Sequence, residues 1–533
     1  MKPAGTLSAM LTMALAPLTL VLLRPLTPID ETRYLAVAWE MFSGGSQLVP
    51  HLNGAIYGHK PPLLFWLIEA AWLTAGVSEI AARLVGPTAA LACVGLTALI
   101  ARRLWPGDPG RAGRAALIAA TSPVFLIYGS ATMFDALLAA TVLLAVIGLI
   151  DGDWRIAGLG LGLGVLAKGP VALIHVLPLA ASLPFWAPGG ISARKAARVT
   201  ALTLAAGSAV VALWLVPALI AGGAEYRAEI LWRQSAGRVV SSFAHQRPIW
   251  FYLALVPALA WPFGWRRVLP QPGRNAGRML AIWMLVPLLL FSLISGKQTH
   301  YLMPELPAMA LLLATAPAEG PATGWLHRML PAVPLALVAG AVIAAAAGAF
   351  GQLPMPAWAV GAALAALAAG LAGRLWLAPL SGRAAMGLAL VIGLHLALAP
   401  VAFGRFDTRP IAALLAPHQR AGIAIIADRY HGQFNFTARL RQPVTRLADA
   451  GALPDWAAAH AGGVVIAPAD LPAPRLRDCW ASAGYAATSG RFINCRGQTG
   501  DTRHFHHPAR PGRGRRHRRS AARHRPRHAA PAA

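Results

Sequence analysis

The sequence contains few charged residues and few cysteines. Asp, Glu, Lys and Arg make up 13% of the 533 residues, whereas hydrophobic residues make up 56%. Soluble globular domains carry about 25% charged residues, so this composition excludes an ordinary soluble protein. The chain has only 3 Cys residues, which excludes a disulfide-rich scaffold.

The three cysteines fall in different parts of the chain. Cys93 lies inside an apolar segment and is expected to be a small core residue. Cys479 and Cys495 lie in the more polar C-terminal part. If that part faces an oxidising compartment these two could form a disulfide, and otherwise they stay free thiols. The sequence leaves both alternatives open.

Long apolar segments are abundant. Stretches of about 17–25 apolar residues can cross a bilayer as helices. These stretches do not alternate apolar and polar residues, as the strands of a membrane barrel would. We therefore predict an all-α polytopic membrane bundle with about thirteen spans, near 6–23, 81–100, 115–131, 136–150, 156–168, 170–187, 199–221, 250–264, 279–295, 301–316, 330–350, 357–378 and 384–403.

The basic residues predict the orientation of the bundle. If the N-terminus is inside, Arg and Lys collect in the short inner loops around 102–114, 194–198 and 266–278, while the short outer loop 132–135 has none. This is the positive-inside pattern. The long loop 24–80 then lies outside, and its amphipathic stretches predict helices that lie along the outer membrane surface.

The character of the chain changes after the last predicted span. Residues 422–428 and 463–469 have the composition of short buried strands, and 455–461 that of a helix. From Asp501 onward the chain is rich in Arg and His, which is typical of a disordered tail. We therefore divide the chain into a membrane domain, a small soluble α/β domain on the outer side and a solvated tail, at 1–403, 404–500 and 501–533.

Most polar residues that could bind a substrate or take part in a reaction are predicted to lie on the outer side. The acidic pair Asp30–Glu31 directly follows the first span, and Arg33 and Tyr34 come next. Carboxylates are costly in hydrocarbon, so this pair should lie at the membrane surface or in a wet site. The other outer candidates are Tyr57, His59, Lys60, Asp135, Lys168, Arg238, His245, Lys297, His300 and Tyr301.

This set of residue types suggests a reaction class. Lys and Arg at a lipid boundary would bind a phosphate. A carboxylate could activate an acceptor hydroxyl, or bind a metal that neutralises a leaving phosphate. The combination predicts group transfer from a lipid-linked phosphate, with no nucleic acid as a partner.

Five motifs carry a family resemblance. DETRYLAVAWEM, YGHKPP, MFDALL, LAKGP and SGKQTHYLMP resemble bacterial polyprenyl-phosphate-dependent glycosyltransferases of the GT-C fold, in particular the aminoarabinose (lipid A-modifying) transferases and the protein O-mannosyltransferases. The resemblance implies an inverting transfer of a sugar from undecaprenyl phosphate to a lipid or glycan acceptor, with lipid A as one candidate. It also implies a site at the periplasmic face of the bacterial inner membrane.

The resemblance assigns roles by position. Asp30 and Asp135 match catalytic acids, and Lys60 matches a ligand of the donor phosphate. The remaining matches, for donor-phosphate and substrate binding, are Arg33, Tyr34, Tyr57, Lys168, Arg238, Lys297 and Tyr301. Lys168 could instead be a lysine that reaches from a helix end to the membrane surface, and Tyr301 an interfacial aromatic residue.

One position departs from the family pattern. His59 stands where aminoarabinose transferases typically have Glu. His59 and Glu31 are therefore candidate ligands of a divalent metal, and a loop histidine bonded to backbone is the alternative for His59. The cofactor is otherwise unknown.

Two other functions make different predictions for this sequence. A transporter or lipid flippase would place ionisable residues near mid-span and show internal repeats, and the sequence shows neither clearly. A scaffold protein that acts through its basic tail would depend on residues 501–533.

Overall fold

The computed structural model describes residues 4–231, 246–264, 275–315, 329–348, 355–468, 479–485 and 490–495. The tail at 501–533 lies outside these ranges. The helices of the membrane part are α1 (Ala4–Leu23), α2 (Asp30–Phe42), α3 (Leu63–Ala75), α4 (Glu79–Arg83), α5 (Val85–Leu104), α6 (Pro109–Thr121), α7 (Pro123–Gly129), α8 (Phe134–Asp151), α9 (Trp154–Lys168), α10 (Val171–Ala181), α11 (Leu183–Trp186), α12 (Ala193–Ala221), α13 (Gly223–Ala228), α15 (Phe251–Ala260), α16 (Asn275–Leu293), α17 (Leu306–Leu313), α19 (Val333–Ala346), α20 (Ala357–Trp376) and α21 (Pro379–Leu398), with the 3-10 helix η2 at Thr299–Glu305.

The centre of the bundle is α8, which packs against α5, α9 and η2. Nearly all of α8 is buried, as its apolar sequence on every side requires. Two glycines let α9 approach its neighbours. A Cβ on Gly160 would lie 2.7 Å from the carbonyl oxygen of Thr141 in α8, and one on Gly162 would lie 2.6 Å from Val210 Cβ in α12. Small residues of this kind allow close packing of helices within a membrane.

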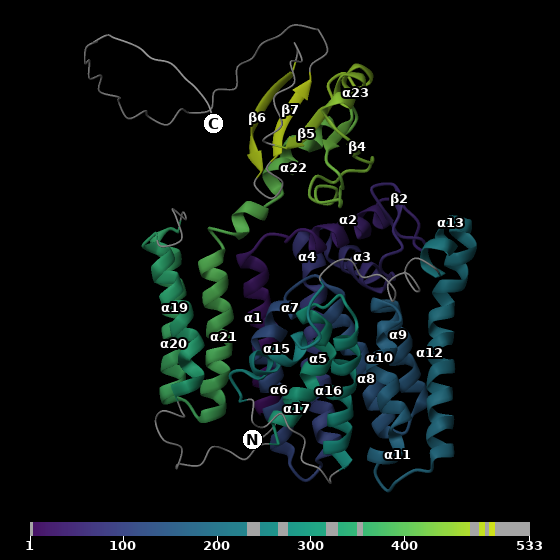
Figure 1. The fold of residues 1–533 in the computed structure, drawn as a ribbon, viewed down its shortest axis with the longest axis vertical. Helices are drawn as coiled ribbons and strands as arrows, with labels where there is room; N and C mark the ends of the chain where they lie inside the picture. The colour runs from purple at the N-terminus through teal and green to yellow at the C-terminus, as the bar shows by residue number, and fades with distance from the viewer. Residues whose placement is uncertain are drawn as a thin grey trace, which may run out of the picture.

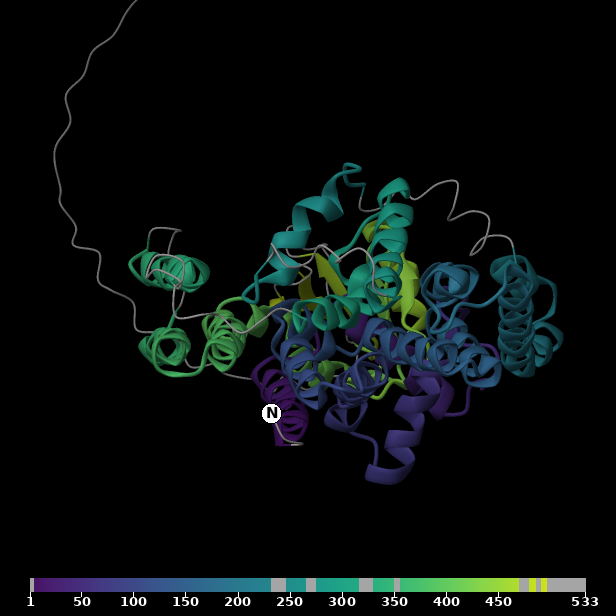
Figure 2. The same ribbon diagram turned by 90° about the horizontal axis from the view of Figure 1, so that it is seen from below.

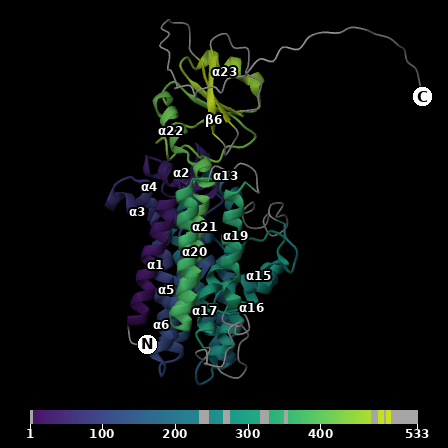
Figure 3. The ribbon, with the colours of Figure 1, turned by 90° about the vertical axis from the view of Figure 1, so that its left-hand side faces the viewer.

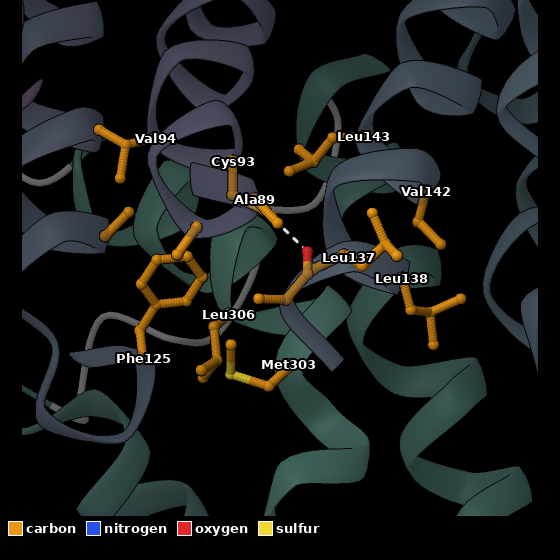
Figure 4. Packing of buried hydrophobic residues seen from close by; sticks show 14 of the residues in the cluster. Ala89, Cys93, Val94, Phe125, Leu137, Leu138, Val142, Leu143, Met303 and Leu306 are labelled. Carbon is orange, nitrogen blue, oxygen red and sulfur yellow. Dashed lines mark hydrogen bonds between the residues drawn. The ribbon is translucent and has the colours of Figure 1, made fainter. Parts of the chain in front are cut away.

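Apolar side chains fill the space between α5, α7, α8 and η2 (Figure 4). Phe125 of α7 and Met303 of η2 are both fully buried there. Cys93, predicted to be a core residue, is fully buried in α5, and its Sγ lies 3.5 Å from the carbonyl oxygen of Ala136. The prediction for Cys93 is therefore confirmed.

Among the described residues, fewer helices than the thirteen predicted spans are long enough to cross a membrane. Within the described residues, 7 helices are long and apolar enough to cross a membrane, or up to 8 if a bent pair counts as one span. That pair is α6 and α7, which meet at an angle of 65° where Pro123 begins α7. Other predicted spans are too short. With its 15 residues, α9 rises about 22 Å, whereas a bilayer core is about 30 Å thick.

The loop 24–80 forms helices across one end of the bundle, as predicted. Helices α2, α3 and α4 lie there beside a hairpin of β1 (His51–Leu52) and β2 (Ala55–Ile56), at the end opposite the N-terminus (Figure 1). In α2, Tyr34, Val37, Ala38 and Met41 are buried at helical spacing. This gives α2 one face toward the bundle and leaves the other for the soluble domain.

The α/β structure predicted for the C-terminal part is confirmed. Its five-stranded sheet has the order β4-β3-β5-β7-β6. Strands β4, β3 and β5 run parallel, and β7 and β6 are antiparallel. The elements are α22 (Arg409–Leu415), β3 (Ile423–Ile426), β4 (Thr445–Leu447), α23 (Leu453–Ala459), β5 (Val464–Pro468), β6 (Cys479–Tyr485) and β7 (Gly490–Cys495). The strand register places Cys479 opposite Cys495, and their side chains lie outside the described part, so their pairing stays a prediction.

The soluble domain sits directly on the helices of the outer loop. Figure 3 shows α2, α3 and α4 between this domain and the long helices of the bundle. Seen along the bundle from below, the green helices α19, α20 and α21 stand beside the main group of helices (Figure 2). The loop 24–80 and the soluble domain thus share one end of the molecule, which the loop charges predict to be the outer one.

Candidate active site

The site begins at the first residue of α2. The Asp30 carboxylate accepts hydrogen bonds from the Arg33 guanidinium and, at 3.0 Å, from the Tyr34 hydroxyl. Spacings of three and four residues put these side chains on one face of a helix. Both bonds end on Oδ1, and the Asp30 side chain is 44% exposed. Asp30 is thus a carboxylate held by a cation on one side and open on the other.

The neighbouring acid, Glu31, points into the protein. Its carboxylate pairs with Arg24 and accepts hydrogen bonds from the amides of Thr27 at 3.0 Å and Thr132 at 2.8 Å. Burial alone would raise the pKa of Glu31, but Arg24 and these donors outweigh it and lower the pKa to about 2. The same Arg24 donates to the Ser130 carbonyl at 3.0 Å. Glu31 therefore ties α2 to the turn that precedes α8.

The contacts of Glu31 bear on its predicted role as a metal ligand, which stays a prediction. Its carboxylate is buried and used by Arg24 and two amides. Within the described ranges, no group of three or more His, Cys, Asp or Glu side chains could hold a metal ion. His59 lies with its ring centroid 5.3 Å from that of Tyr57, and its metal role stays a prediction.

The second acid, Asp135, lies in the first turn of α8. It forms an ion pair with Lys168, the last residue of α9, and both side chains are largely buried, at 2% and 10% exposed. The Lys168 ammonium also lies 4.8 Å from the centroid of the Tyr301 ring in η2. The structure therefore joins Asp135 and Lys168, which are 33 positions apart in the sequence, with Tyr301, which lies more than a hundred positions further along the chain.

His300 shows that the two acids belong to one site. The charges of Asp135, Lys168, Asp30 and Lys60 all act on its ring. Burial lowers the pKa of His300 to about 4, so it is neutral at pH 7. The Lys60 ammonium lies 5.6 Å from the centroid of the Phe134 ring, the residue before Asp135. The outer loop, α2, α8, α9 and η2 thus bring both acids and both lysines together.

The aromatic residues predicted to belong to the site, Tyr34 and Tyr57, lie in the same cluster. Tyr34 is buried, and its ring packs edge-on against Phe134 with centroids 4.8 Å apart. Tyr57 is also buried, and its ring centroid lies 6.2 Å from that of Phe65, which packs edge-on against Phe134 with centroids 5.6 Å apart. These rings line the cluster rather than forming a belt at the membrane surface.

The predicted phosphate ligand Lys297 is bonded outside this cluster. Lys297 is buried, and its ammonium donates to the carbonyl oxygens of Arg247 at 3.0 Å and Ile294 at 2.5 Å. It ties the end of α16 to the segment before α15. Arg238 and His245 lie outside the described residues.

Three contributors were not assigned a role from the sequence. His300 was only one of several outer polar residues, Phe134 was part of the MFDALL motif, and Arg24 was not among the candidates. Each acquires its role through a partner distant in sequence, such as Arg24 with Ser130. A local motif carries no signal for such a partner.

The arrangement suits transfer of a group from a phosphate. Lys60 and Lys168 supply positive charge for a phosphate, and neutral His300 can donate a hydrogen bond to it. Asp30 has its Oδ2 available to orient or deprotonate an acceptor. Because the cations and Asp30 come from different elements, donor and acceptor groups could be held side by side.

Comparison with known proteins gives consistent results. Residues 59–220 match the family model described as dolichyl-phosphate-mannose-protein mannosyltransferase. That segment contains Lys60, Asp135 and Lys168, and Asp30 precedes it. The chain is also 31% identical over 309 residues to an undecaprenyl phosphate-alpha-4-amino-4-deoxy-L-arabinose arabinosyl transferase of Pseudomonas aeruginosa, and 31% identical over 310 residues to one of Pseudomonas fluorescens.

These alignments cover 54% and 53% of the chain, and 55% and 52% of the two relatives. The chain thus spans about half the length of the curated relatives it matches. The fold is similar to the crystal structures of ArnT from Cupriavidus metallidurans bound to undecaprenyl phosphate and in the apo state, with TM-scores of 0.72 and 0.71. Both matches cover 94% of this chain and 100% of the other, at 18% and 19% identity.

Proposed function

We propose that this chain transfers a sugar from undecaprenyl phosphate to an acceptor at the outer face of its membrane. It is a polytopic membrane protein related to the dolichyl-phosphate-mannose-protein mannosyltransferases and to the aminoarabinose transferases. The observation that carries the proposal is the contact network that joins Asp30 and Lys60 through the Tyr34 and Phe134 rings to the neighbouring Asp135–Lys168 pair. The named relatives use a donor of this chemical class. The acceptor is a lipid or a glycan, with lipid A as one candidate, and the host membrane is a bacterial inner membrane.

The reaction follows from the charges in the site. The bond between the anomeric carbon and the phosphate oxygen breaks, and its electron pair stays on the phosphate. Lys60 and Lys168 stabilise that leaving group by their positive charge. The acceptor oxygen forms the new bond from the opposite face of the sugar, which inverts the configuration. If the acceptor is a hydroxyl, its proton passes to Asp30.

Asp135 has a positioning role in this proposal. Its carboxylate holds Lys168 at the end of α9, and Tyr301 covers the same ammonium. The pair keeps the lysine side chain at the site instead of allowing it to reach toward the membrane surface. Arg33 and Tyr34 position Asp30 in the same way.

The decisive test is Asp30→Asn in the purified full-length protein, with undecaprenyl phosphate-linked aminoarabinose as donor and lipid A as acceptor. The variant should transfer sugar at least about a hundredfold more slowly, the range for loss of a general base. Asp151→Asn is the matched control, because Asp151 lies in the last turn of α8 and pairs with Arg103 far from the site. A folded Asp30→Asn variant with the wild-type transfer rate would contradict the assignment.

The alternative of a transporter or flippase predicts movement of lipid without a covalent product. The structure does contain a buried ionisable pair, His175 and Glu305, that the sequence analysis did not identify. His175 is the fifth residue of α10, about 6 Å from the helix start, so the pair lies near one end of the bundle. A glycosylated product found by mass spectrometry distinguishes the two functions.

A further inference from the structure

One segment of the soluble domain reaches the site, although no sequence motif pointed to it. The loop 428–433 follows β3, the central strand of the parallel group β4-β3-β5. In sheets of parallel strands, ligands bind at the carboxyl ends of the strands. This loop therefore occupies the edge of the sheet where a binding function is expected.

The backbone of this loop is held against α2. Gly432 has a φ of +71°, and a Cβ at this position would lie 2.6 Å from Leu52 Cδ1 and 3.0 Å from Ala36 Cβ. Ala36 lies one helical turn after Arg33, so this contact brings the loop to the part of α2 that carries Asp30 and Arg33. Only a glycine permits so close an approach in this conformation.

The rest of the loop is fastened on both sides of Gly432. The Tyr430 hydroxyl donates to Asn435 Oδ1 at 2.6 Å, and Asn435 Nδ2 donates to Asn53 Oδ1 of the hairpin at 3.3 Å. The amide of His431 donates to Gln433 Oε1 at 3.2 Å. The loop is therefore a fixed part of the surface next to α2.

Charged residues around the site form two groups that share Asp30. The membrane-side group is Lys60, Asp135 and Lys168, whose charges act with that of Asp30 on His300. The domain-side group is Arg33 and Arg429, whose charges act with that of Asp30 on His431. Burial lowers the pKa of His431, and the two arginines lower it further, so its ring is neutral at pH 7 and can donate or accept a hydrogen bond.

The two groups would bind different substrates, the membrane-side group the donor and the domain-side group the acceptor. A phosphate carried on a polyprenyl tail arrives from the bilayer, where Lys168 stands at the end of α9 and Lys60 lies just before α3. Asp30, the residue that would meet the acceptor nucleophile, lies between this group and the domain-side group. The acceptor then has to approach Asp30 from the side of Arg33 and the loop 428–433. Arg33 Nε is buried without a hydrogen-bond partner among the described residues, as expected where a ligand completes the site.

We propose that the loop 428–433 of the soluble domain is the outer half of the acceptor site, with His431 and Arg429 contacting the acceptor beside Arg33. This inference rests on the proposed function and assigns the choice of acceptor to a domain outside the membrane bundle. Arg429 is exposed and the charges of Arg429 and Arg33 both act at His431, so the site favours an acceptor group with negative charge.

The test compares steady-state kinetics of full-length variants, with the concentrations of donor and lipid A varied separately. His431→Ala and Arg429→Ala should each raise the KM for lipid A about tenfold, the effect of losing one hydrogen bond to a charged group. The KM for undecaprenyl phosphate-linked aminoarabinose should stay within about twofold of wild type, because the donor is held by the other group. His431→Gln should recover most of the loss, since an amide can also donate and accept.

Arg420→Ala is the matched control for Arg429→Ala. Arg420 is also exposed, but it precedes β3 and lies at the opposite edge of the sheet, beside Gln442 and His460. The KM of the Arg420→Ala variant for lipid A should equal that of the wild type. A rise in the donor KM in place of the lipid A KM, or equal KM values in the Arg429 and Arg420 variants, would overturn the inference and leave the proposed function standing.

Direct binding of lipid A to the protein in nanodiscs, with no donor present, separates the two proposals further. Weaker binding by His431→Ala than by Arg420→Ala supports the acceptor site even if no sugar transfer is observed, which would contradict the proposed function alone. Equal binding by the two variants contradicts the acceptor site.

Discussion

Two adjacent acidic residues of α2 lie in different environments. Asp30 and Glu31 have the same charge and follow each other in sequence, but successive residues of a helix point about 100° apart. Asp30 remains 44% exposed beside Arg33, whereas Glu31 is buried against Arg24. One acid is thus available for chemistry, and the other holds α2 in place.

Glu31→Gln should lower the stability of the protein. It leaves the buried Arg24 without a countercharge, which costs about 3 kcal/mol of unfolding free energy. Thermal unfolding in detergent measures this loss, and Glu225→Gln at an exposed position of α13 is the control. An unchanged midpoint in Glu31→Gln would contradict the structural role.

The same residue predicts a pH dependence. The folded pKa of Glu31 is about 2, below its ordinary value of 4.5. A lowered pKa means that the stabilisation is fully present above about pH 4.5 and is lost as the pH falls toward 2. The difference in unfolding midpoint between wild type and Glu31→Gln should therefore shrink over this interval. A constant difference down to pH 2 would contradict this reading of Glu31.

At the scale of elements, η2 is fastened to the corner between α9 and α10 at two levels. Tyr301 covers the Lys168 ammonium, and one turn further Glu305 Oε1 lies 2.5 Å from His175 Nδ1. His175 and Glu305 are 0% and 5% exposed. The contact between His175 and Glu305 thus keeps His300 and Tyr301 in register with the end of α9.

His175→Leu should destabilise the protein by about 3 kcal/mol or more, because it leaves Glu305 buried without its partner. The double variant His175→Leu/Glu305→Leu should recover most of this loss, since an apolar pair can replace a buried polar pair. The unfolding free energies of the wild type, the two single variants and the double variant form the complete cycle. Additive losses in the double variant would show that the two side chains are not coupled.

At the scale of the whole molecule, the soluble domain is docked on the membrane part through aromatic and cationic contacts. The Phe436 and Trp72 rings stack with centroids 5.2 Å apart, and the Arg439 guanidinium lies 3.9 Å from the Phe436 centroid. Trp39 Nε1 of α2 donates to the Leu440 carbonyl at 2.8 Å. The helix that begins with Asp30 is therefore held from the bundle side and from the domain side.

Arg439→Ala should loosen this docking. It removes a partly buried cation–π contact, worth up to about 2 kcal/mol, and a hydrogen bond to the Val77 carbonyl. Hydrogen exchange should quicken in α2 and in the loop 428–433, with no change in α8. Arg420→Ala serves again as control, and unchanged exchange in α2 would contradict a role of this interface in holding the helix.

Local sequence patterns were sufficient for the class of protein, the outer helices of the loop 24–80 and the strands of the soluble domain. Each depends on the hydrophobicity of a single segment. The described residues hold fewer helices of spanning length than predicted, because the apolar character of a segment such as α9 does not fix the length of its helix in the bundle. Asp30, Asp135, Lys60, Lys168 and Tyr301 were identified from motifs, and the structure brings them together.

The sequence by itself determined that this is a membrane protein with its reactive side chains on one face. This is possible because the free energy of transferring a segment into lipid is a sum over the residues of that segment. Only the tertiary structure decided which acid is buried, which histidine is added to the site and which edge of the soluble domain faces Asp30. Those outcomes depend on pairs such as Glu31 with Thr132, Lys168 with Asp135 and Gly432 with Ala36. The energy of each pair depends on distances between remote parts of the chain, and no local pattern contains them.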